Sequence, residues 1–286
     1  MLRDHSSMTK LLYIANSRIP TEKAHGVQIM EMCSAFGKAG LDVELLVPRR
    51  RNTLPDDPFA YYALPKNFSI TKLWTLDLVS WGPLGFHIQS MSFAIAAFLH
   101  VRKQKGALLY SRDELPLFFL SFLGSPFFYE AHGPRWSSIT RRITKLARGV
   151  IVISEGLKNF FVQKGVPASL LLNAPDGVNT ERFSQVPSRY ECRMQLNLPT
   201  TVPIVLYLGH LYARKGAHLL AEAVQFVEGE SVFVFVGGTS DDIRRFRERY
   251  GAHTRVSVLG HKPPHLVPFY LRAADILVLP NSATSE

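Results

Sequence analysis

Short apolar runs alternate with amphipathic stretches along almost the whole chain. Apolar runs bounded by glycine, proline or polar residues predict buried strands, and apolar residues at helical spacing predict helices packed on them. Strands are expected at 11–15, 43–47, 68–76, 107–110, 126–129, 149–153, 170–172, 204–208, 231–236, 256–259 and 276–279. Helices are expected at 27–38, 84–102, 115–123, 137–147, 155–164, 217–227, 241–250 and 266–273. This alternation predicts an α/β protein with parallel sheets.

The strand–helix alternation begins twice, which predicts two domains. The segment 173–203 contains P-D-G-V-N-T and three further prolines, so the junction is expected inside it. We place an N-terminal domain at 1–186 and a C-terminal domain at 187–286. The second domain has about four strands, and no helix follows the last one to cover it. We therefore expect an incomplete second domain in a fragment of a longer protein.

Composition indicates a globular protein of a reducing compartment. Hydrophobic residues make up 47% and charged residues 20% of the 286 residues. The two cysteines, Cys33 and Cys192, lie far apart, which argues against a disulfide scaffold or a zinc ribbon. The N-terminus has no apolar signal core, and polar residues, glycine or proline interrupt the apolar stretches 86–99 and 115–128. A cytoplasmic location is expected, with both stretches buried.

The formal net charge of +10 indicates an anionic partner, either a nucleotide, a nucleic acid or an acidic membrane surface. No nucleic-acid-binding motif is found, so no nucleic-acid partner is expected. Five cations lie in the segment 135–148 with no acidic residue between them, namely Arg135, Arg141, Arg142, Lys145 and Arg148. This segment is either a solvated helix face over a core stripe or a surface that contacts the inner face of an anionic membrane.

The stretch 207–220, Y-L-G-H-L-Y-A-R-K-G-A-H-L-L, joins a buried strand to a helix through a basic loop bounded by glycines. Open α/β sheets bind ligands at such loops, and the helix start favours an anion. Lys215, just before Gly216, can add a full positive charge. The loop is either a phosphate site or an ordinary tight turn with a solvated lysine.

Seven segments follow one another in a fixed order, namely K-A-H-G-V-Q-I, Y-E-A-H-G, V-I-V-I-S-E-G-L-K, N-A-P-D-G-V-N-T-E-R-F, the stretch 207–220, V-F-V-F-V-G-G-T and V-S-V-L-G-H-K-P-P-H-L-V-P-F-Y-L-R-A-A-D-I-L-V-L-P-N-S. Together they resemble family 4 (group 1) glycosyltransferases of the GT-B fold. The resemblance implies two Rossmann-like domains whose parallel sheets face a central cleft. It also implies transfer of a sugar from a nucleotide-sugar to a saccharide or lipid-linked acceptor of cell-surface polysaccharide or glycolipid synthesis, with retention at the anomeric carbon. Neither a cofactor nor a metal is expected, because protein cations neutralise the leaving diphosphate.

The resemblance assigns donor-binding roles to six residues of the second half. They are Gly209, His210, Arg214, Lys215, Gly237 and Gly238. Lys215 falls at the diphosphate lysine of the family and is also a catalytic candidate. His210 stands where the family usually has arginine, and Arg214 either replaces that charge or faces solvent. Gly237 and Gly238 either let the nucleotide approach the backbone or form a tight turn.

In the first half, the resemblance assigns Gly26 to the loop that approaches the donor and His132 to the histidine near the transferred sugar, a catalytic candidate. The alternatives are a simple helix-start glycine at 26 and a core histidine at 132. His25 and Glu130 are acceptor-side candidates, with a structural role as the alternative for each. The paired glutamates of the family lie beyond residue 280, where Glu286 is the one candidate. The alternatives to a transferase are a nucleotide-sugar epimerase or phosphorylase of the same fold, and a non-catalytic binding protein.

Overall fold

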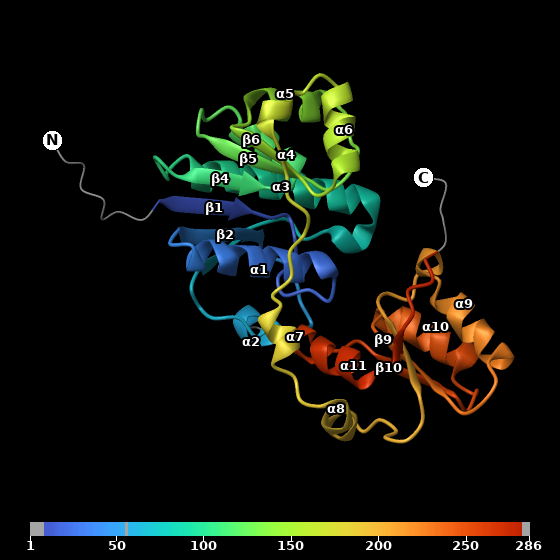
Figure 1. Cartoon of the computed structure of the whole chain (residues 1–286). Helices are drawn as coiled ribbons and strands as arrows, with labels where there is room; N and C mark the ends of the chain where they lie inside the picture. The colour runs from blue at the N-terminus through green and yellow to red at the C-terminus, as the bar shows by residue number, and fades with distance from the viewer. Residues whose placement is uncertain (1–8, 55–56, 282–286) are drawn as a thin grey trace. The chain divides into compact units, whose positions relative to one another are not determined.

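The structure is a computed structural model that describes residues 9–54 and 57–281. The chain divides into two compact units with the boundary between Val178 and Asn179 (Figure 1). The boundary expected from the sequence, between 186 and 187, lies a few residues further along the same proline-rich segment. Each unit contains its own parallel sheet and its own core.

A seven-stranded parallel sheet forms the centre of the N-terminal unit. Its strands are β1 (Lys10–Ile14), β2 (Asp42–Pro48), β3 (Ser69–Leu73), β4 (Leu108–Ser111), β5 (Phe127–Ala131), β6 (Gly149–Val152) and β7 (Leu171–Asn173). Their order in the sheet is β3-β2-β1-β4-β5-β6-β7. The chain moves outward from β1 to β3 and then returns to the other side of β1. The carboxyl ends of β1 and β4 therefore flank a switch point, where open α/β sheets bind ligands.

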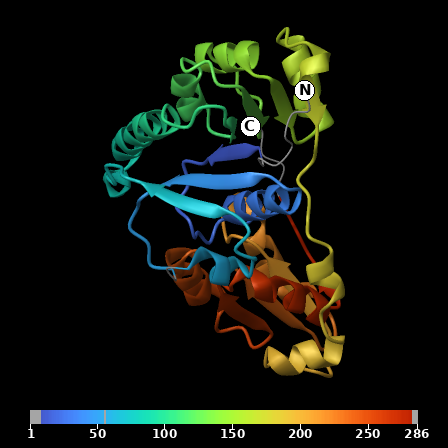
Figure 2. The same ribbon diagram turned by 90° about the vertical axis from the view of Figure 1, so that its left-hand side faces the viewer.

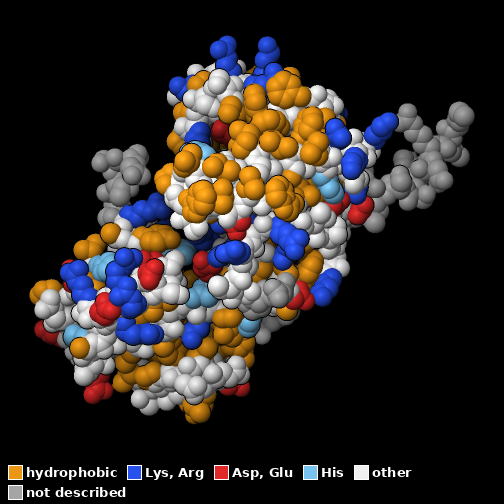
Figure 3. Space-filling model, turned by 180° about the vertical axis from the view of Figure 1, so that it is seen from behind, with side chains coloured by type: hydrophobic (Ala, Val, Ile, Leu, Met, Phe, Trp, Pro, Cys, Tyr) orange, Lys and Arg blue, Asp and Glu red, His pale blue; other side chains and the backbone are white. Residues whose placement is uncertain are grey.

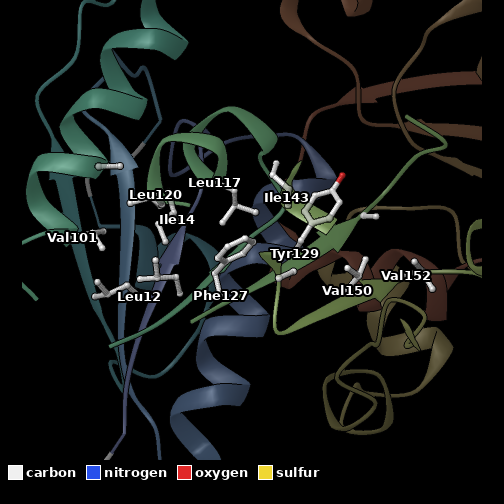
Figure 4. Close-up of a cluster of buried hydrophobic side chains, with 14 of the residues drawn as sticks. Leu12, Ile14, Val101, Leu117, Leu120, Phe127, Tyr129, Ile143, Val150 and Val152 are labelled. Carbon is white, nitrogen blue, oxygen red and sulfur yellow. The ribbon is translucent and has the colours of Figure 1, made fainter. Parts of the chain in front are cut away.

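Helices cover both faces of this sheet (Figure 2). One face is covered by α1 (Ala24–Lys38) and α2 (Pro58–Tyr62), and the other by α3 (Pro83–Val101), α4 (Glu114–Leu120), α5 (Ser138–Leu146) and α6 (Glu155–Gln163). Figure 4 shows the core on the second of these faces, in which side chains of β1, β5 and β6 meet those of α3, α4 and α5. Short 3-10 turns, η1 (Val79–Trp81) and η2 (Ala168–Leu170), precede α3 and β7.

The C-terminal unit contains a four-stranded parallel sheet. Its strands are β8 (Ile204–Leu208), β9 (Val232–Val236), β10 (Val256–Gly260) and β11 (Ile276–Leu277), in the order β10-β9-β8-β11. The helical elements are α7 (Glu181–Ser184), α8 (Arg189–Gln195), η3 (Ala213–Lys215), α9 (Ala217–Ala223), η4 (Val224–Phe226), α10 (Ser240–Tyr250), η5 (Pro264–Leu266) and α11 (Val267–Ala273). Helices α9 and α10 pack on one face, and α8 and α11 on the other. The switch point of this sheet lies between β8 and β11.

A buried arginine connects three elements of the C-terminal unit. Arg193 of α8 is 5% exposed and donates from Nε to the carbonyl of Ala273, at 2.9 Å. Its Nη2 lies 2.5 Å from Oδ2 of Asp275, which also accepts the backbone N–H of Ile204, at 2.7 Å. The pair therefore ties α8 to the starts of β8 and β11.

The predicted α/β class is confirmed, and the differences are local. Residues 58–62, where no element was expected, form α2 because the Asp57 carboxylate caps the amides of Phe59 and Ala60 and Pro58 fits the first turn. The expected helix 217–227 ends at Ala223 and continues as a 3-10 turn. Its buried stripe consists of Ala217, Leu220, Ala221 and Val224, whereas Leu219 is exposed.

Candidate functional site

In the N-terminal unit, the candidate residues collect at the carboxyl edge of β1, β4 and β5. The start of α1 follows β1, Arg112 follows β4, and His132 follows β5. Asn16, just after β1, donates its backbone N–H to Oδ2 of Asp113, at 2.7 Å. Its side chain is held by Gln89 and Ser90 of α3, both at 2.9 Å. The switch-point loop is thus fixed from two sides.

Glu130 is the centre of a buried polar network. The residue is 2% exposed. Its Oε2 accepts the hydroxyl of Tyr110 at 2.6 Å, and its Oε1 accepts the side-chain amide of Gln28, one turn of α1 beyond His25, at 2.8 Å. The Nε2 of His132 also contacts Oε1. A buried carboxylate with this many donors is well satisfied and fixes the positions of all its partners.

The electrostatics of this network keep Glu130 ionised. Burial alone would raise the pKa of its carboxyl, but hydrogen bonds from His132 and Tyr110 and the nearby charge of Arg112 bring the pKa below its ordinary value. The guanidinium of Arg112 reaches Glu130 through Gln28, to which it donates at 2.9 Å. Burial and then the Glu130 charge raise the pKa of Tyr110, so this phenol stays a donor.

The contact with Glu130 orients the imidazole of His132. A carboxylate only accepts hydrogen bonds, so Nε2 of His132 carries a proton. The other ring nitrogen, Nδ1, is then the atom through which His132 can bind a ligand or exchange a proton with it. One ligand atom from each of Glu130, His132 and the exposed Asp176 lies within 4.8 Å of the other two. This geometry suits a group that offers hydroxyls or positive charge.

Gly26 and His25 lie in the first turn of α1, close to this network in sequence. A Cβ at Gly26 would collide with the methyl group of Thr21 and the hydroxyl of Tyr62. That hydroxyl accepts the amide of Thr21 at 2.8 Å and donates to its carbonyl at 2.9 Å. Packing inside the unit is therefore enough to explain why this position needs glycine. The approach of a ligand to Gly26 stays a prediction.

In the C-terminal unit, the basic loop leaves β8 at its switch point. Lys215 and Arg214 are exposed within η3, directly before α9. The His210 ring stacks on that of Tyr212, with centroids 4.8 Å apart and planes 5° from parallel. The His210 carbonyl accepts the hydroxyl of Tyr207 at 2.6 Å. The loop is thus held by aromatic contacts, and its two long cations, Arg214 and Lys215, are exposed.

Glycines bring the loops after β8 and β9 into contact. Gly237 has a φ of +117°, and a Cβ there would collide with the backbone of Gly209. Gly238 has a φ of +95° and packs on Leu211. The amide of Gly209 donates to Val236, at 2.9 Å, and that of Gly237 to Gly260, at 2.8 Å. These two amides are therefore engaged within the sheet, and the exposed positive charge of this loop is that of Lys215 and Arg214.

The structure brings Glu130 and His132 together and places His25 and Gly26 on the same helix as Gln28. It likewise groups the donor candidates of the second half around the end of β8. Glu286 lies outside the described residues. The residues of this site that were not predicted from the sequence are Gln28, Tyr110, Arg112 and Asp176. The positions of Tyr110 near the end of a buried strand and of Arg112 just after it were the signal that could have indicated these two residues.

Comparison with known proteins identifies relatives of this chain. Residues 188–286 match the family described as glycosyl transferases group 1. A D-inositol 3-phosphate glycosyltransferase of Xylanimonas cellulosilytica is 34% identical over 119 residues, 37% of this chain and 28% of that protein. A GDP-mannose-dependent alpha-(1-6)-phosphatidylinositol monomannoside mannosyltransferase of Mycobacterium tuberculosis is 28% identical over 149 residues, 50% and 38% of the two chains. The matches thus span well under half of these relatives.

A solved structure confirms the fold. The Anabaena protein Alr3699/HepE, in complex with UDP and glucose, superposes with a TM-score of 0.70 at 17% identity. The match covers 96% of this chain and 75% of that one. The expected GT-B class, built from two Rossmann-like units with parallel sheets, is therefore confirmed.

Proposed function

We propose that this chain, a relative of the group 1 glycosyltransferases with their GT-B fold, moves a sugar from a nucleotide-sugar to an acceptor with retention of the anomeric configuration. The observation that carries the proposal is the basic loop 209–216, which lies at the switch point of the second sheet within the segment that matches the family. The acceptor is a saccharide or lipid-linked saccharide of cell-surface polymer or glycolipid synthesis, used at the cytoplasmic face of a membrane.

Departure of a nucleoside diphosphate leaves negative charge that the protein must stabilise. Lys215 and Arg214 supply two exposed cations beside the start of α9, and cations placed where charge develops are a large catalytic term. We expect transfer to continue in EDTA, since these side chains take the place of a metal. Loss of activity in EDTA that returns with a divalent ion would instead show that transfer needs a metal, for which the cluster of Glu130, His132 and Asp176 is the candidate site.

His132 contacts the transferred sugar in this proposal. The buried carboxylate of Glu130 holds Nε2 of His132. The imidazole is thereby oriented so that it presents Nδ1 to a sugar hydroxyl. The role of Glu130 is then to position His132, while Arg112 and Gln28 keep the carboxylate in place.

The test is release of nucleoside diphosphate from a donor panel that includes UDP-glucose and GDP-mannose, the compounds named for two related proteins. Release that requires an acceptor is expected, and Lys215→Ala should lower kcat/KM about 100-fold. The matched control is Arg244→Ala, which removes an exposed cation of α10 and should leave the rate unchanged. Sugar conversion without an acceptor would indicate an epimerase. A well-folded, full-length protein that turns over no donor would indicate a binding protein.

A further inference from the structure

The side of α3 that faces away from the sheet is exposed and, apart from His87, apolar, so the stretch 86–99 is only partly buried and not buried as expected. Leu84, Met91, Ile95 and Leu99 recur at helical spacing and are 69%, 42%, 46% and 44% exposed. The helix contains no Lys, Arg, Asp or Glu between Pro83 and Val101. Solvent-facing helix sides are normally polar, so a side that is apolar except for one histidine indicates a surface that is covered by a partner.

Aromatic residues extend this surface at the start of the helix. Trp81 of η1 is 70% exposed, and Phe86 is 46% exposed. We define the α3 surface as Trp81, Leu84, Phe86, Met91, Ile95 and Leu99. Leu76, also exposed, borders it, since its amide donates to Ser92 of α3 at 3.1 Å. Figure 3 shows hydrophobic side chains gathered on this side of the N-terminal unit, with Lys and Arg at their margins.

Within residues 78–154, the exposed charged side chains are all positive. Residues 78–154, all of them described, contain nine Lys and Arg but only three acidic residues. None of the three, Asp113, Glu114 and Glu130, is exposed. Exposed cations follow α3 directly (Arg102, Lys103 and Lys105), and three more lie on or beside α5 (Arg141, Lys145 and Arg148). An apolar stripe bordered by cations without exposed carboxylates matches an anionic lipid surface.

Helices α3 and α5 belong to one continuous layer. Helix α4 packs against both α3 and α5. The guanidinium of Arg142 on α5 lies 4.2 Å from the centre of the Phe122 ring, just after α4, and its Nε donates to Ser121 at 3.0 Å. The basic helix singled out in the sequence is therefore the margin of the α3 surface, to which it adds charge.

By length and composition, α3 is the one helix among the described residues that could cross a membrane. Its other side, however, belongs to the core, because Phe93, Ala94, Ala97 and Val101 are buried against the sheet. Spanning would require those contacts to be given up, whereas lying on the bilayer leaves them intact. The geometry therefore favours surface attachment over insertion.

We propose that the α3 surface attaches the protein to an anionic bilayer, with Trp81 and the apolar stripe at the boundary between headgroups and acyl chains and the cations against acidic headgroups. Trp is favoured at this boundary because its ring is amphipathic. The attachment uses none of the residues of the candidate active site. It is therefore independent of sugar transfer and can be measured without donor or acceptor.

The test is cosedimentation of the full chain with vesicles of equal parts phosphatidylglycerol and phosphatidylcholine, and with vesicles of phosphatidylcholine alone. Binding is expected to the acidic vesicles and to weaken with salt. Leu84→Gln combined with Ile95→Gln should weaken it by about tenfold or more. The matched control is Leu219→Gln with Phe226→Gln, which alters two exposed apolar residues of the C-terminal unit and should bind as the parent does. Circular dichroism melts would show that both variants fold.

Tryptophan emission gives a second readout of membrane contact. It does not require the folded fractions of the variants to be compared. Brominated acyl chains should quench the parent protein on acidic vesicles, and Trp81→Phe should remove much of that quenching. The proposal is overturned if the parent does not bind, if it binds both vesicles equally, or if the α3 double variant binds normally. A dimer in solution that the same double variant dissociates would overturn it too, because a second copy would then cover the surface.

Discussion

At the scale of single residues, Glu130 connects the fold to the proposed chemistry. A carboxylate this deeply buried is retained at a cost unless its partners satisfy it, and here Tyr110, Gln28 and His132 do so. These partners come from β4, α1 and the end of β5, so one side chain fixes the mutual position of three elements. Its removal should affect activity through the orientation of His132.

Glu130→Gln should lower kcat/KM by about 10- to 100-fold, because the amide cannot hold the same imidazole tautomer as strongly. A purely structural residue would not alter how the rate depends on pH, whereas a positioning residue should shift that profile. Glu155→Gln, at an exposed carboxylate of α6, is the control and should change neither. An unchanged pH profile in Glu130→Gln would contradict the positioning role.

The stability of the protein in acid should depend on the carboxyl of Glu130. The pKa of Glu130 is lowered in the folded protein, so the unfolded chain takes up a proton first as the pH falls. Its contribution to the free energy of unfolding is therefore complete above the ordinary pKa of about 4.3 and is lost as the pH falls through the lower folded value. Urea unfolding from pH 7 to pH 3 should show a smaller decline in Glu130→Gln than in the parent. Equal declines would contradict the ionised, buried carboxylate.

At the scale of elements, the connection from β8 to α9 depends on Gly216. Its φ of +71° lies in the left-handed region, and a Cβ would collide with the backbone carbonyl of Pro280, just after β11. The residue thus holds the basic loop against the neighbouring strand end, which is where the proposed donor diphosphate would bind.

Gly216→Ala should lower the free energy of unfolding by about 2–3 kcal/mol, from backbone strain and the collision together. Gly229→Ala separates the two causes. Gly229 has a φ of +79°, and a Cβ at this position would meet no atom within 4 Å, so its cost should be only about 1 kcal/mol. Chemical denaturation of both variants gives the difference, and equal losses would show that the contact with Pro280 carries no energy.

Most of the strands and helices could be predicted from the sequence. The apolar pattern located every strand, most readily those such as β1 and β9, whose buried residues form continuous apolar runs. It missed α2, a helix of five residues with too few turns for a periodic signal, and also α7 and α8, which lie in the expected linker. The partners of Glu130 were out of reach for another reason. Gln28 and Tyr110 are separated from it by 102 and 20 residues, and only the folded sheet brings them together.

At the scale of the whole molecule, separate cores in the two units predict two separable stabilities. Arg193→Met removes the cation from the partly buried carboxylate of Asp275, and three further hydrogen bonds of the guanidinium to backbone carbonyls are lost with it. We expect a loss of about 3 kcal/mol that is confined to the C-terminal unit. Arg189→Met, at the exposed cation on the other oxygen of the same carboxylate, should cost under about 1 kcal/mol.

Hydrogen exchange with peptide-level readout checks this prediction. Protection should fall in β8, β11 and α8 of Arg193→Met and stay unchanged in β1, β4 and β5. A loss spread evenly over both units would mean that they unfold as one.

Helix α3 touches both the switch-point loop and the proposed lipid surface. On its inner side, Gln89 and Ser90 hold Asn16 at the carboxyl edge of β1, and on its outer side lies the α3 surface. The helix is then a spacer of its own diameter, about 10 Å, between the bilayer and that edge. An attached enzyme would search for lipid-linked acceptors in two dimensions at a set height. It would thereby select acceptors by how far their sugar stands above the membrane.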